Sequence, residues 1–412
     1  MKSFDDACRV LFGSTAGGIK WGLETTASLL DSLGHPERHF ASVHVGGTNG
    51  KGSTSAFLAA ILRAQGFRVG LYTSPHLVSF TERMEVDGQP ASEEAVAAWV
   101  ERLEPLAAGT EASFFEITTA IAFADFAARG VEIAVVEVGL GGRLDATNVI
   151  TPLACGVTRI AREHTEYLGE DLAGIAREKA GIAKPGVPFF TTEQNPELVA
   201  AMEREVASRG SKVEQVDPHL AQGVTLGLRG AHQVANASLA AALARSLHGR
   251  FAVGEDAIRQ GLAQAHIPGR FDRRGRWLFD VAHNPDGMRA LTAALRAERL
   301  PAPLQAVVAV LKDKEWRAML EILAPEVDAI VLTRSPSAPA DRAWDVDEAL
   351  RWCWDIGLST RGEPGRQAVS AEPDFAAALA AASPGRGTAL ITGSFHTVGD
   401  ALARLPGFAP LG

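Results

Sequence analysis

The sequence is poor in cysteine and has no long apolar run, and each absence narrows the class of protein. Cys8, Cys155 and Cys353 lie far apart in the 412 residues, so neither a zinc site nor a disulfide framework is indicated. No apolar run reaches the length that spans a bilayer, and the N-terminal residues MKSFDDACRV lack the apolar core of a secretory signal. We therefore expect a cytoplasmic protein of a reducing compartment, without a membrane partner.

An excess of basic residues is also absent. The net charge is −9 at pH 7, which argues against a nucleic-acid binder, because such proteins need a basic surface. A local basic pocket for phosphates and carboxylates is compatible with this charge. There is no short-period repeat, low-complexity tract or heptad run, so nothing in the sequence indicates an oligomer. The apolar fraction of 46% and the charged fraction of 22% are those of a globular protein, and the length suits two domains or three.

The most informative stretch is 41–65, ASVHVGGTNGKGSTSAFLAAILRAQ. It predicts a strand, a glycine-rich loop and a helix, the context in which such a loop binds phosphate. Glycines let backbone N–H groups point inward, and the helix N-terminus adds partial positive charge. Gly50, Lys51, Gly52 and Ser53 are the candidates: the lysine for the outer phosphates, the serine hydroxyl for a metal ion. The alternative is an ordinary glycine-rich turn, since Gly52 separates the lysine from the serine.

Apolar runs predict further strands, and several end in polar side chains. In the first two thirds of the chain the predicted strands are 68–72, 133–138, 153–160, 188–191 and 212–216. Glu137 is the one charge in the strand IAVVEV, and Ser74 and His164 follow two other strands. A carboxylate at the end of a buried strand is costly unless paired or metal-bound, and magnesium prefers carboxylate, phosphate and water oxygens. An exposed glutamate, a surface loop and a structural histidine are the alternatives.

The alternation of strands and helices restarts after Ile267-Pro268-Gly269-Arg270. Strands are predicted at 277–281, 305–311, 329–333 and 388–392, so the fold class is α/β with two domains. We predict a phosphate-loop domain with a mostly parallel sheet at 1–268, a hinge at 269–276, and a smaller Rossmann-like domain at 277–412. The second domain has its own polar strand ends, at Asp280, His283, Asn284 and Ser394. Two such domains suggest an enzyme that closes on a nucleotide and a second substrate.

Eight segments then occur in one order along nearly the whole chain: VGGTNGKGST, YTSPHLVSFTER, VEVGLGGRLDATN, HTEYLG, REKAGI, PGRF, FDVAHNP and ITGSFHTVGD. As a set, they resemble the folylpolyglutamate synthase and dihydrofolate synthase enzymes of the Mur ligase superfamily. Members of this superfamily form amide bonds in reactions that consume ATP. The order lysine-glycine-serine around Gly52 resembles the phosphate-loop motif of this family.

The resemblance implies a role for each matching residue. The ATP contacts are Gly50, Lys51, Gly52, Ser53, Asn236, Arg270 and Asp280. The metal ligands, for two magnesium ions, are Ser53, Ser74, Glu137, His164 and a carbamylated Lys179. The pterin surface is Gly18, Ile19, Lys20, Trp21, Ser113, Phe114, Phe115, Glu116, Leu144, Asp145 and Ala146. His283 and Ser394 hold the incoming glutamate, and Lys51, Lys179 and His283 are the catalytic residues. Composition alone places Lys179 on a solvated helix face, because it lies in the charge run Arg177-Glu178-Lys179.

The implied reaction is the ATP-dependent ligation of L-glutamate to dihydropteroate or to the glutamate tail of a folate, through an acyl phosphate. It uses no protein nucleophile, which suits cysteines outside these segments. The resemblance also implies a monomer. One alternative is a cell-wall ligase of the same superfamily. Another is a phosphate-loop NTPase that binds nucleotide without ligating anything, which leaves Asp280, His283 and Ser394 unexplained.

Overall fold

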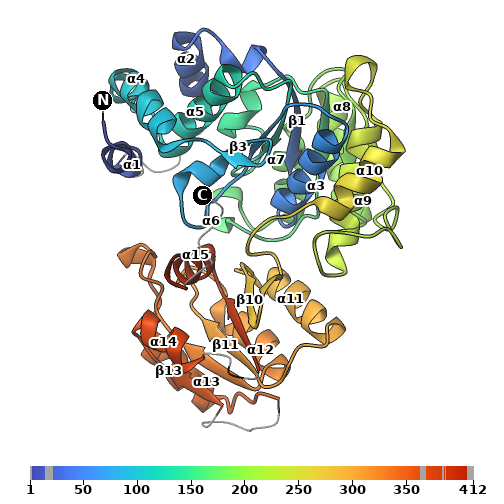
Figure 1. The fold of residues 1–412 in the computed structure, drawn as a ribbon. Helices are drawn as coiled ribbons and strands as arrows, with labels where there is room; N and C mark the ends of the chain where they lie inside the picture. The colour runs from blue at the N-terminus through green and yellow to red at the C-terminus, as the bar shows by residue number, and fades with distance from the viewer. Residues whose placement is uncertain (1, 14–21, 362–367, 383–384, 386, 406–412) are drawn as a thin grey trace. The chain divides into compact units, whose positions relative to one another are not determined.

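The computed structural model describes residues 2–13, 22–361, 368–382, 385 and 387–405. The chain divides into two compact units, each with its own sheet (Figure 1). The first comprises Met1–Gly227 and Gln233–His266, and the second Leu228–His232 and Ile267–Gly412. The short segment Leu228–His232 therefore groups with the second unit, which a single boundary near residue 268 does not anticipate. The functional assignment of the predicted segments 1–268, 269–276 and 277–412 stays a prediction.

The first unit contains an eight-stranded sheet in the order β4-β3-β2-β5-β1-β6-β7-β8. Its strands are β1 (Ala41–Gly46), β2 (Val69–Tyr72), β3 (Met84–Val86), β4 (Gln89–Pro90), β5 (Ile133–Glu137), β6 (Ala154–Val157), β7 (Phe189–Thr191) and β8 (Val213–Gln215). The pairings from β2 to β8 are parallel, and only β3 and β4 add antiparallel pairings. The mostly parallel sheet is confirmed. The two antiparallel strands are too short to show a periodicity in the sequence. Because β1 lies between β5 and β6, the loop after β1 lies in the middle of the carboxyl edge.

Helices cover this sheet (Figure 1). They are α1 (Phe4–Gly13), α2 (Glu24–Ser32), α3 (Lys51–Ala64), α4 (Glu93–Thr110), α5 (Phe114–Ala128), α6 (Thr165–Leu168), α7 (Leu172–Ala180), α8 (Pro196–Ser208), α9 (His232–Arg245) and α10 (Glu255–Gln264). Short 3₁₀ helices are η2 (Pro36–Arg38), η3 (Phe80–Arg83), η4 (Ala146–Val149) and η5 (Gly249–Phe251). The helix after the phosphate loop, α3, is buried on nearly every side because β1, β2 and β5 pack on it as well as α10. A side chain at Gly261 of α10 would overlap the backbone of Ile61. This close packing holds the last turns of α3 against α10; the first turn of α3 is part of the predicted ATP site.

The second unit is built on a six-stranded sheet in the order β13-β12-β11-β14-β10-β9. The strands are β9 (Asp272–Arg274), β10 (Trp277–Asp280), β11 (Leu304–Val308), β12 (Ala329–Leu332), β13 (Val369–Ala371) and β14 (Thr388–Thr392). Its helices are α11 (Pro285–Ala297), α12 (Trp316–Leu323), η6 (Ala324–Glu326), η7 (Ala340–Arg342), α13 (Val346–Asp355), α14 (Phe375–Ala381) and α15 (Phe395–Arg404). All pairings are parallel except that of β9 with β10. The predicted α/β character of this part of the chain is confirmed.

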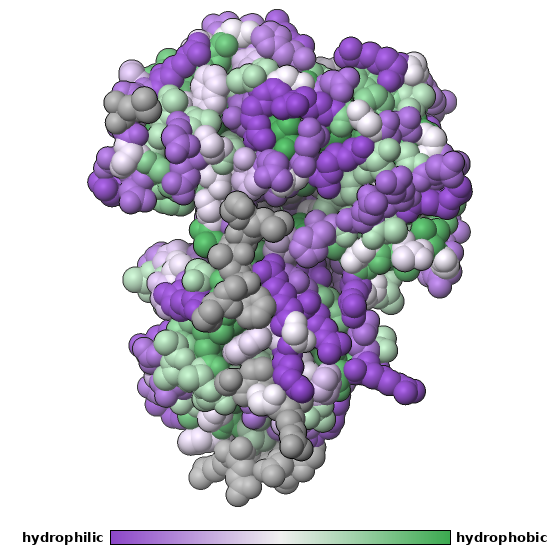
Figure 2. Space-filling view, viewed as in Figure 1, coloured by the Kyte–Doolittle hydropathy of each residue, from purple (hydrophilic) through white to green (hydrophobic). Residues whose placement is uncertain are grey.

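The surface of the described residues carries few large apolar side chains. Figure 2 shows hydrophilic residues over much of the viewed face of each unit. The large apolar residues that are exposed are Phe12, Val78, Leu153, Tyr167, Leu220 and Ile356. Among the described residues, no helix has both the length and the apolar character needed to cross a membrane.

Candidate active site

The loop between β1 and α3 has the backbone shape of a phosphate loop. Gly47 and Gly50 adopt positive φ angles of 132° and 97°, which residues with a Cβ rarely adopt. Gly50 is the N-cap of α3 and provides no side-chain cap, so N–H groups of the first turn face outward with the positive end of the helix dipole. Lys51 Nζ donates to the carbonyl oxygen of Thr48 at 3.0 Å, and Ser53 is buried two residues into the helix. The loop therefore has the glycine conformations and the helix start that the predicted phosphate site needs, and its binding of ATP stays a prediction.

Asn236 lies against this loop from α9. Its side chain is mostly buried, and its Nδ2 donates to Gln233 Oε1 at 2.9 Å. A Cβ on Gly50 would overlap Asn236 Oδ1. The structure thus brings together two predicted ATP contacts that are far apart in sequence.

We predict that Gly50→Ala destroys this arrangement. The new methyl group would overlap Asn236 Oδ1, and the alanine would have to adopt a φ of 97°. We therefore expect ATP affinity to fall about 10-fold or more and the free energy of unfolding to fall by about 1–3 kcal/mol. Isothermal titration with ATP and thermal denaturation measure the two effects. Gly66→Ala is the matched control, because Gly66 has a φ of 100° and a methyl group there would meet no atom within 4 Å. Equal ATP affinity in both variants contradicts the prediction.

Two predicted metal ligands meet where β2 and β5 end. Tyr72 of β2 is level with Val136 of β5, so the residues that follow both strands emerge at one edge. The Ser74 N–H donates to Glu137 Oε2 at 3.1 Å, and the Glu137 side chain is buried. Its carboxylate is therefore held at the carboxyl edge of the sheet, as the sequence predicts.

His164 lies at the same edge, beyond β6. It is the N-cap of α6, with a φ of 53°, and its side chain is partly exposed. Its Nδ1 is 4.0 Å from Glu166 Oε1. Among the residues that the structure describes, no group of three or more His, Cys, Asp or Glu is placed to hold a metal ion. The predicted ligand set has only two residues of those types, so hydroxyl and phosphate oxygens would have to complete it. That donor set fits magnesium, which is held by few carboxylates together with substrate phosphates.

Lys179 is buried, and the solvated helix face that composition suggests is wrong. Its side chain is only 5% exposed, and Nζ donates to the Gly47 carbonyl oxygen at 2.8 Å. Burial, followed by the nearby charge of Lys51, lowers the pKa of the Lys179 amine to about 7. The charge run in the sequence hides this, because α7 packs against α8 and turns Lys179 toward the phosphate loop.

The predicted pterin surface begins α5. Ser113 and Glu116 form a capping box: the N–H and Oγ of Ser113 donate to Glu116 Oε2 at 2.8 and 2.7 Å. The polar groups of these two residues therefore serve the helix end. Phe114 and Phe115 lie between them, and their rings are only partly buried. The aromatic rings are the parts of this segment best suited to a flat pterin ring.

The second part of this surface, Leu144 to Ala146, lies in the loop after β5. The Asp145 carboxylate accepts hydrogen bonds from the N–H groups of Leu140 and Thr147, at 2.8 and 3.0 Å, and from the Thr147 hydroxyl. Its side chain is nearly fully buried, and burial raises the pKa of the carboxyl group. Asp145 thus shapes the loop itself. The remaining predicted contacts, Gly18, Ile19, Lys20 and Trp21, lie outside the described residues.

Arg83 is a candidate that the sequence does not reveal. It is 7% exposed, its Nε donates to His76 Nδ1 at 2.8 Å, and its guanidinium carbon is 5.0 Å from the centre of the Phe114 ring. A buried guanidinium beside partly buried rings is suited to a carboxylate on an aromatic ligand. In the sequence it follows Thr81 and Glu82, which resembles a polar loop and gives no sign of burial.

In the second unit, Phe395 connects two predicted ligand contacts. Its ring centre is 5.2 Å from the guanidinium carbon of Arg270 and 5.3 Å from the centre of the His283 ring. The Val281 carbonyl oxygen, which can only accept, lies 2.8 Å from His283 Nδ1. That nitrogen therefore carries the proton, and in neutral His283 the Nε2 atom is the acceptor.

Asp280 and Ser394 make contacts to the backbone around them. The Asp280 carboxylate accepts hydrogen bonds from the N–H groups of Phe271 and Ala282, both at 2.9 Å, and so ties the predicted hinge to the end of β10. Burial raises the pKa of this carboxyl group. Ser394 is the N-cap of α15, and its Oγ accepts from the Thr397 N–H at 3.0 Å. Whether these residues also bind ligands stays a prediction.

Comparison with known proteins decides the family. The Mur ligase middle domain matches residues 45–189, and the Mur ligase glutamate ligase domain matches residues 269–395. The dihydrofolate synthase/folylpolyglutamate synthase of Bacillus subtilis is 30% identical over 98% of this chain and 99% of its own length. The chain belongs to the folylpolyglutamate synthase/dihydrofolate synthase family of Mur ligases.

Other members of this family differ in length. A probable bifunctional folylpolyglutamate synthase/dihydropteroate synthase of Halobacterium salinarum is 37% identical over 97% of this chain. The chain spans about half of that relative, 51%. The Escherichia coli dihydrofolate synthase/folylpolyglutamate synthase is 34% identical over 92% of this chain and 90% of its own length.

Solved structures of the family have the same fold. Escherichia coli FolC in complex with DHPP and ADP has a TM-score of 0.83 and 30% identity, covering 98% of this chain and 97% of that one. Mycobacterium tuberculosis folylpolyglutamate synthase complexed with ADP has a TM-score of 0.81 and 34% identity, covering 92% and 93%. A further family structure, with a TM-score of 0.79, 30% identity and coverage of 93% and 94%, has Mn, AMPPNP and L-glutamate bound.

Proposed function

We propose that this family member adds L-glutamate to the carboxylate of dihydropteroate, to the glutamate tail of tetrahydrofolate, or to both, with ATP giving ADP and phosphate. The observation that carries the proposal is the 2.8 Å hydrogen bond from Lys179 to the carbonyl oxygen of Gly47. This bond places a buried amine beside the phosphate loop. A protein that only binds nucleotide does not need a second lysine at this position. Relatives named for both ligations, and structures of relatives with ADP, DHPP or L-glutamate, support the same reaction.

Magnesium would be held by Ser53, Ser74, Glu137 and His164, together with phosphate oxygens of the nucleotide. When bound, it neutralises phosphate charge that otherwise repels an incoming carboxylate. We further propose that Lys179 is carbamylated, which turns a cation into an anion able to hold a second magnesium ion. The burial of Lys179 and its lowered pKa support this, because only a neutral amine adds carbon dioxide.

The chain's own residues then have defined tasks. N–H groups at the start of α3 and the Lys51 amine hold the terminal phosphate of ATP. A carboxylate oxygen of the pterin substrate forms a bond to the γ-phosphorus, the bond to ADP breaks, and an acyl phosphate results. The glutamate amine, oriented by His283 and Ser394, attacks the acyl carbon; phosphate leaves and the nitrogen loses a proton. Phe114, Phe115 and the loop with Leu144 to Ala146 position the pterin, which replaces a chance encounter by a fixed geometry.

Arg270, Asp280 and Asn236 complete the proposed nucleotide site. Arg270 and Asp280 belong to the predicted hinge and the start of the second domain, so nucleotide contacts there would couple ATP binding to closure, which excludes water from the acyl phosphate. We also infer a cytoplasmic, monomeric enzyme with small-molecule partners only. Cysteine usage supports the reducing compartment, and the net charge argues against a nucleic-acid partner. Analytical gel filtration tests the monomer.

The decisive assay measures ATP-dependent glutamate incorporation, with dihydropteroate and tetrahydrofolate compared at equal concentration. We expect phosphate release only when glutamate and a pterin substrate are both present. If ATP is hydrolysed equally fast with and without these two substrates, the proposal is contradicted and a phosphate-loop NTPase is favoured. Addition of alanine to a UDP-sugar peptide, without glutamate incorporation, favours a cell-wall ligase.

A further inference from the structure

The loop that carries the proposed pterin contacts rests directly on the helix that carries Lys179. At Gly142 the loop backbone comes so close to α7 that a Cβ would be 2.8 Å from the carbonyl oxygens of Glu178 and Lys179, and 2.9 Å from Lys179 Cα. Only a residue without a side chain permits this approach. The loop and the lysine backbone are therefore one packed unit.

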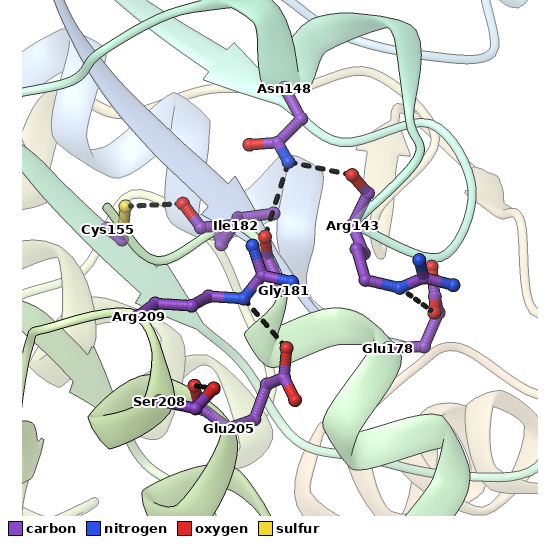
Figure 3. A network of polar contacts seen from close by, with 9 residues as sticks. All are labelled: Arg143, Asn148, Cys155, Glu178, Gly181, Ile182, Glu205, Ser208 and Arg209. Carbon is purple, nitrogen blue, oxygen red and sulfur yellow. Dashed lines mark hydrogen bonds and ion pairs between the residues drawn. The ribbon is translucent and has the colours of Figure 1, made fainter. Parts of the chain in front are cut away.

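Arg143 joins the loop to α7 through both its backbone and its side chain; Figure 3 shows the side-chain contact with Glu178. Its N–H donates to the Glu178 carbonyl oxygen at 3.0 Å, and its Nε donates to Glu178 Oε2 at 3.0 Å. A side chain at Gly181 would overlap Arg143 Cβ, so the arginine stem also packs on the end of α7. One residue thus joins the loop to α7 by a backbone hydrogen bond, an ion pair and packing.

Asn148 closes the other end of the same loop (Figure 3). Its Nδ2 donates to the Arg143 carbonyl oxygen at 2.9 Å and to the Gly181 carbonyl oxygen at 3.3 Å. Lys184 Nζ donates to the Asn148 carbonyl oxygen at 2.7 Å. The residues between Arg143 and Asn148 include the three proposed pterin contacts, so both ends of that segment are bound to α7 and the turn after it.

The opposite side of the segment is bound to β1. The Thr147 hydroxyl donates to Asp145, which can only accept, and it therefore accepts from His44 Nε2 at 2.8 Å. His44 is fully buried in β1, two residues before Gly46 and the phosphate loop. The pterin loop is thus held between the strand that leads to the phosphate loop and the helix that carries Lys179.

We propose that Arg143 is a positioning residue for ligation: its pairing with Glu178 fixes the register of Leu144 to Ala146 against Lys179 and the phosphate loop. This inference rests on the proposed function, because it assigns the loop to the pterin substrate. The ion pair is partly exposed, with side-chain exposures of 46% for Arg143 and 18% for Glu178, and such pairs contribute little to folding. A displacement of about 1 Å can nevertheless lower a rate about 100-fold. The effect of Arg143 should therefore appear in kinetics and scarcely in stability.

Arg143→Ala tests this in the full chain. We expect kcat/KM for the pterin substrate to fall about 10-fold, with the KM for ATP and the melting temperature nearly unchanged. Arg177→Ala is the matched control. It removes another ion pair of α7, that of Arg177 with the N-cap residue Asp171 at 3.5 Å, which joins no residue of the loop. The control should behave as wild type. The charge-reversed double variant R143E/E178R should be more active than either single variant.

Hydrogen exchange provides a readout that does not need turnover. Amides of residues 139–149 should exchange faster in Arg143→Ala than in wild type and in Arg177→Ala. If wild type ligates glutamate and Arg143→Ala matches the control in kinetics and exchange, the positioning role is overturned alone. A fall in ATP and pterin parameters together with a lower melting temperature also overturns it, because that marks a structural role. If wild type ligates nothing, the proposed function fails, and the role of Arg143 in ligation fails with it.

Discussion

Glu137→Gln is expected to abolish magnesium-dependent ligation while leaving the first unit folded. Glutamine keeps the size of the side chain and an oxygen that can still accept the Ser74 N–H, now 3.1 Å from Glu137 Oε2. It removes the negative charge that a hard cation requires. Without that charge the metal loses its one buried carboxylate ligand in the proposed set, and turnover should fall about 1,000-fold or more. Circular dichroism should stay close to that of wild type.

Steady-state turnover at increasing magnesium concentration measures the effect, together with titration of ATP with and without magnesium. Glu193→Gln is the matched control. Glu193 is a buried carboxylate beyond β7 that accepts the Ile160 N–H at 2.9 Å, much as Glu137 accepts that of Ser74. We expect this control to cost stability but to keep its magnesium response. Turnover of Glu137→Gln within about 10-fold of wild type refutes the ligand role.

Lys179→Met is expected to remove ligation and, at neutral pH, to stabilise the fold. Methionine fills a similar volume but cannot form a carbamate, so turnover should fall about 100-fold or more. The expected gain in stability follows from the buried amine, whose pKa is lowered to about 7 from 10.5. Between these two values the native lysine is neutral while the unfolded lysine is protonated, so wild-type stability rises with pH across that window. Below about pH 7 the full cost of burial is present.

The variant lacks this cost, which is on the order of a few kcal/mol from a shift of this size. Denaturant unfolding in magnesium-free, bicarbonate-free buffer should therefore show the variant to be more stable at pH 7, and the difference should shrink toward pH 10. Lys184→Met is the control. Burial lowers the pKa of Lys184 as well, but its Nζ donates to the carbonyl oxygen of Asn148 and not to that of Gly47 in the phosphate loop. Parallel pH profiles for wild type and Lys179→Met contradict the prediction.

The carbamate itself is tested on wild-type protein kept near neutral pH with bicarbonate. Intact-mass measurement should find the added carbon dioxide in wild type and in Lys184→Met, and should not find it in Lys179→Met. Because carbamates are labile, a crystal structure grown with bicarbonate is the decisive check, and a bare amine at Lys179 in its density counts against the proposal.

The parts of the site that depend on neighbours in sequence could be predicted from the sequence. Glycines, lysine and serine between an apolar strand and a helix specify the phosphate loop, because turn shape and helix dipole are local properties. The lone charge in IAVVEV likewise predicts a carboxylate at a strand end, and Glu137 lies there. The spacing of Ser113 and Glu116 is that of a capping box, a signal in the sequence that explains their contacts without a ligand.

Other features depend on which segments fold together. Lys179 and Arg83 both lie in charged runs, and burial cannot be inferred there, because a local charge pattern is the same on an exposed face and on a packed one. Contacts 132 residues apart, between Lys179 and Gly47, turn the first toward the phosphate loop. Arg83 is buried through its contact with the Phe114 ring and its hydrogen bond to His76, which the sequence does not show.

The sequence by itself thus determined the α/β class, the phosphate loop and, through its ordered segments, the resemblance to the ligase family. Tertiary structure decided which charged residues are buried. It also decided that Asp145 and Ser394 accept hydrogen bonds from nearby backbone N–H groups, and that Arg143 joins the pterin loop to the helix of Lys179. The physical reason is range: turns, caps and strand periodicity are set by adjacent residues, whereas desolvation and ion pairing depend on atoms that only folding brings together.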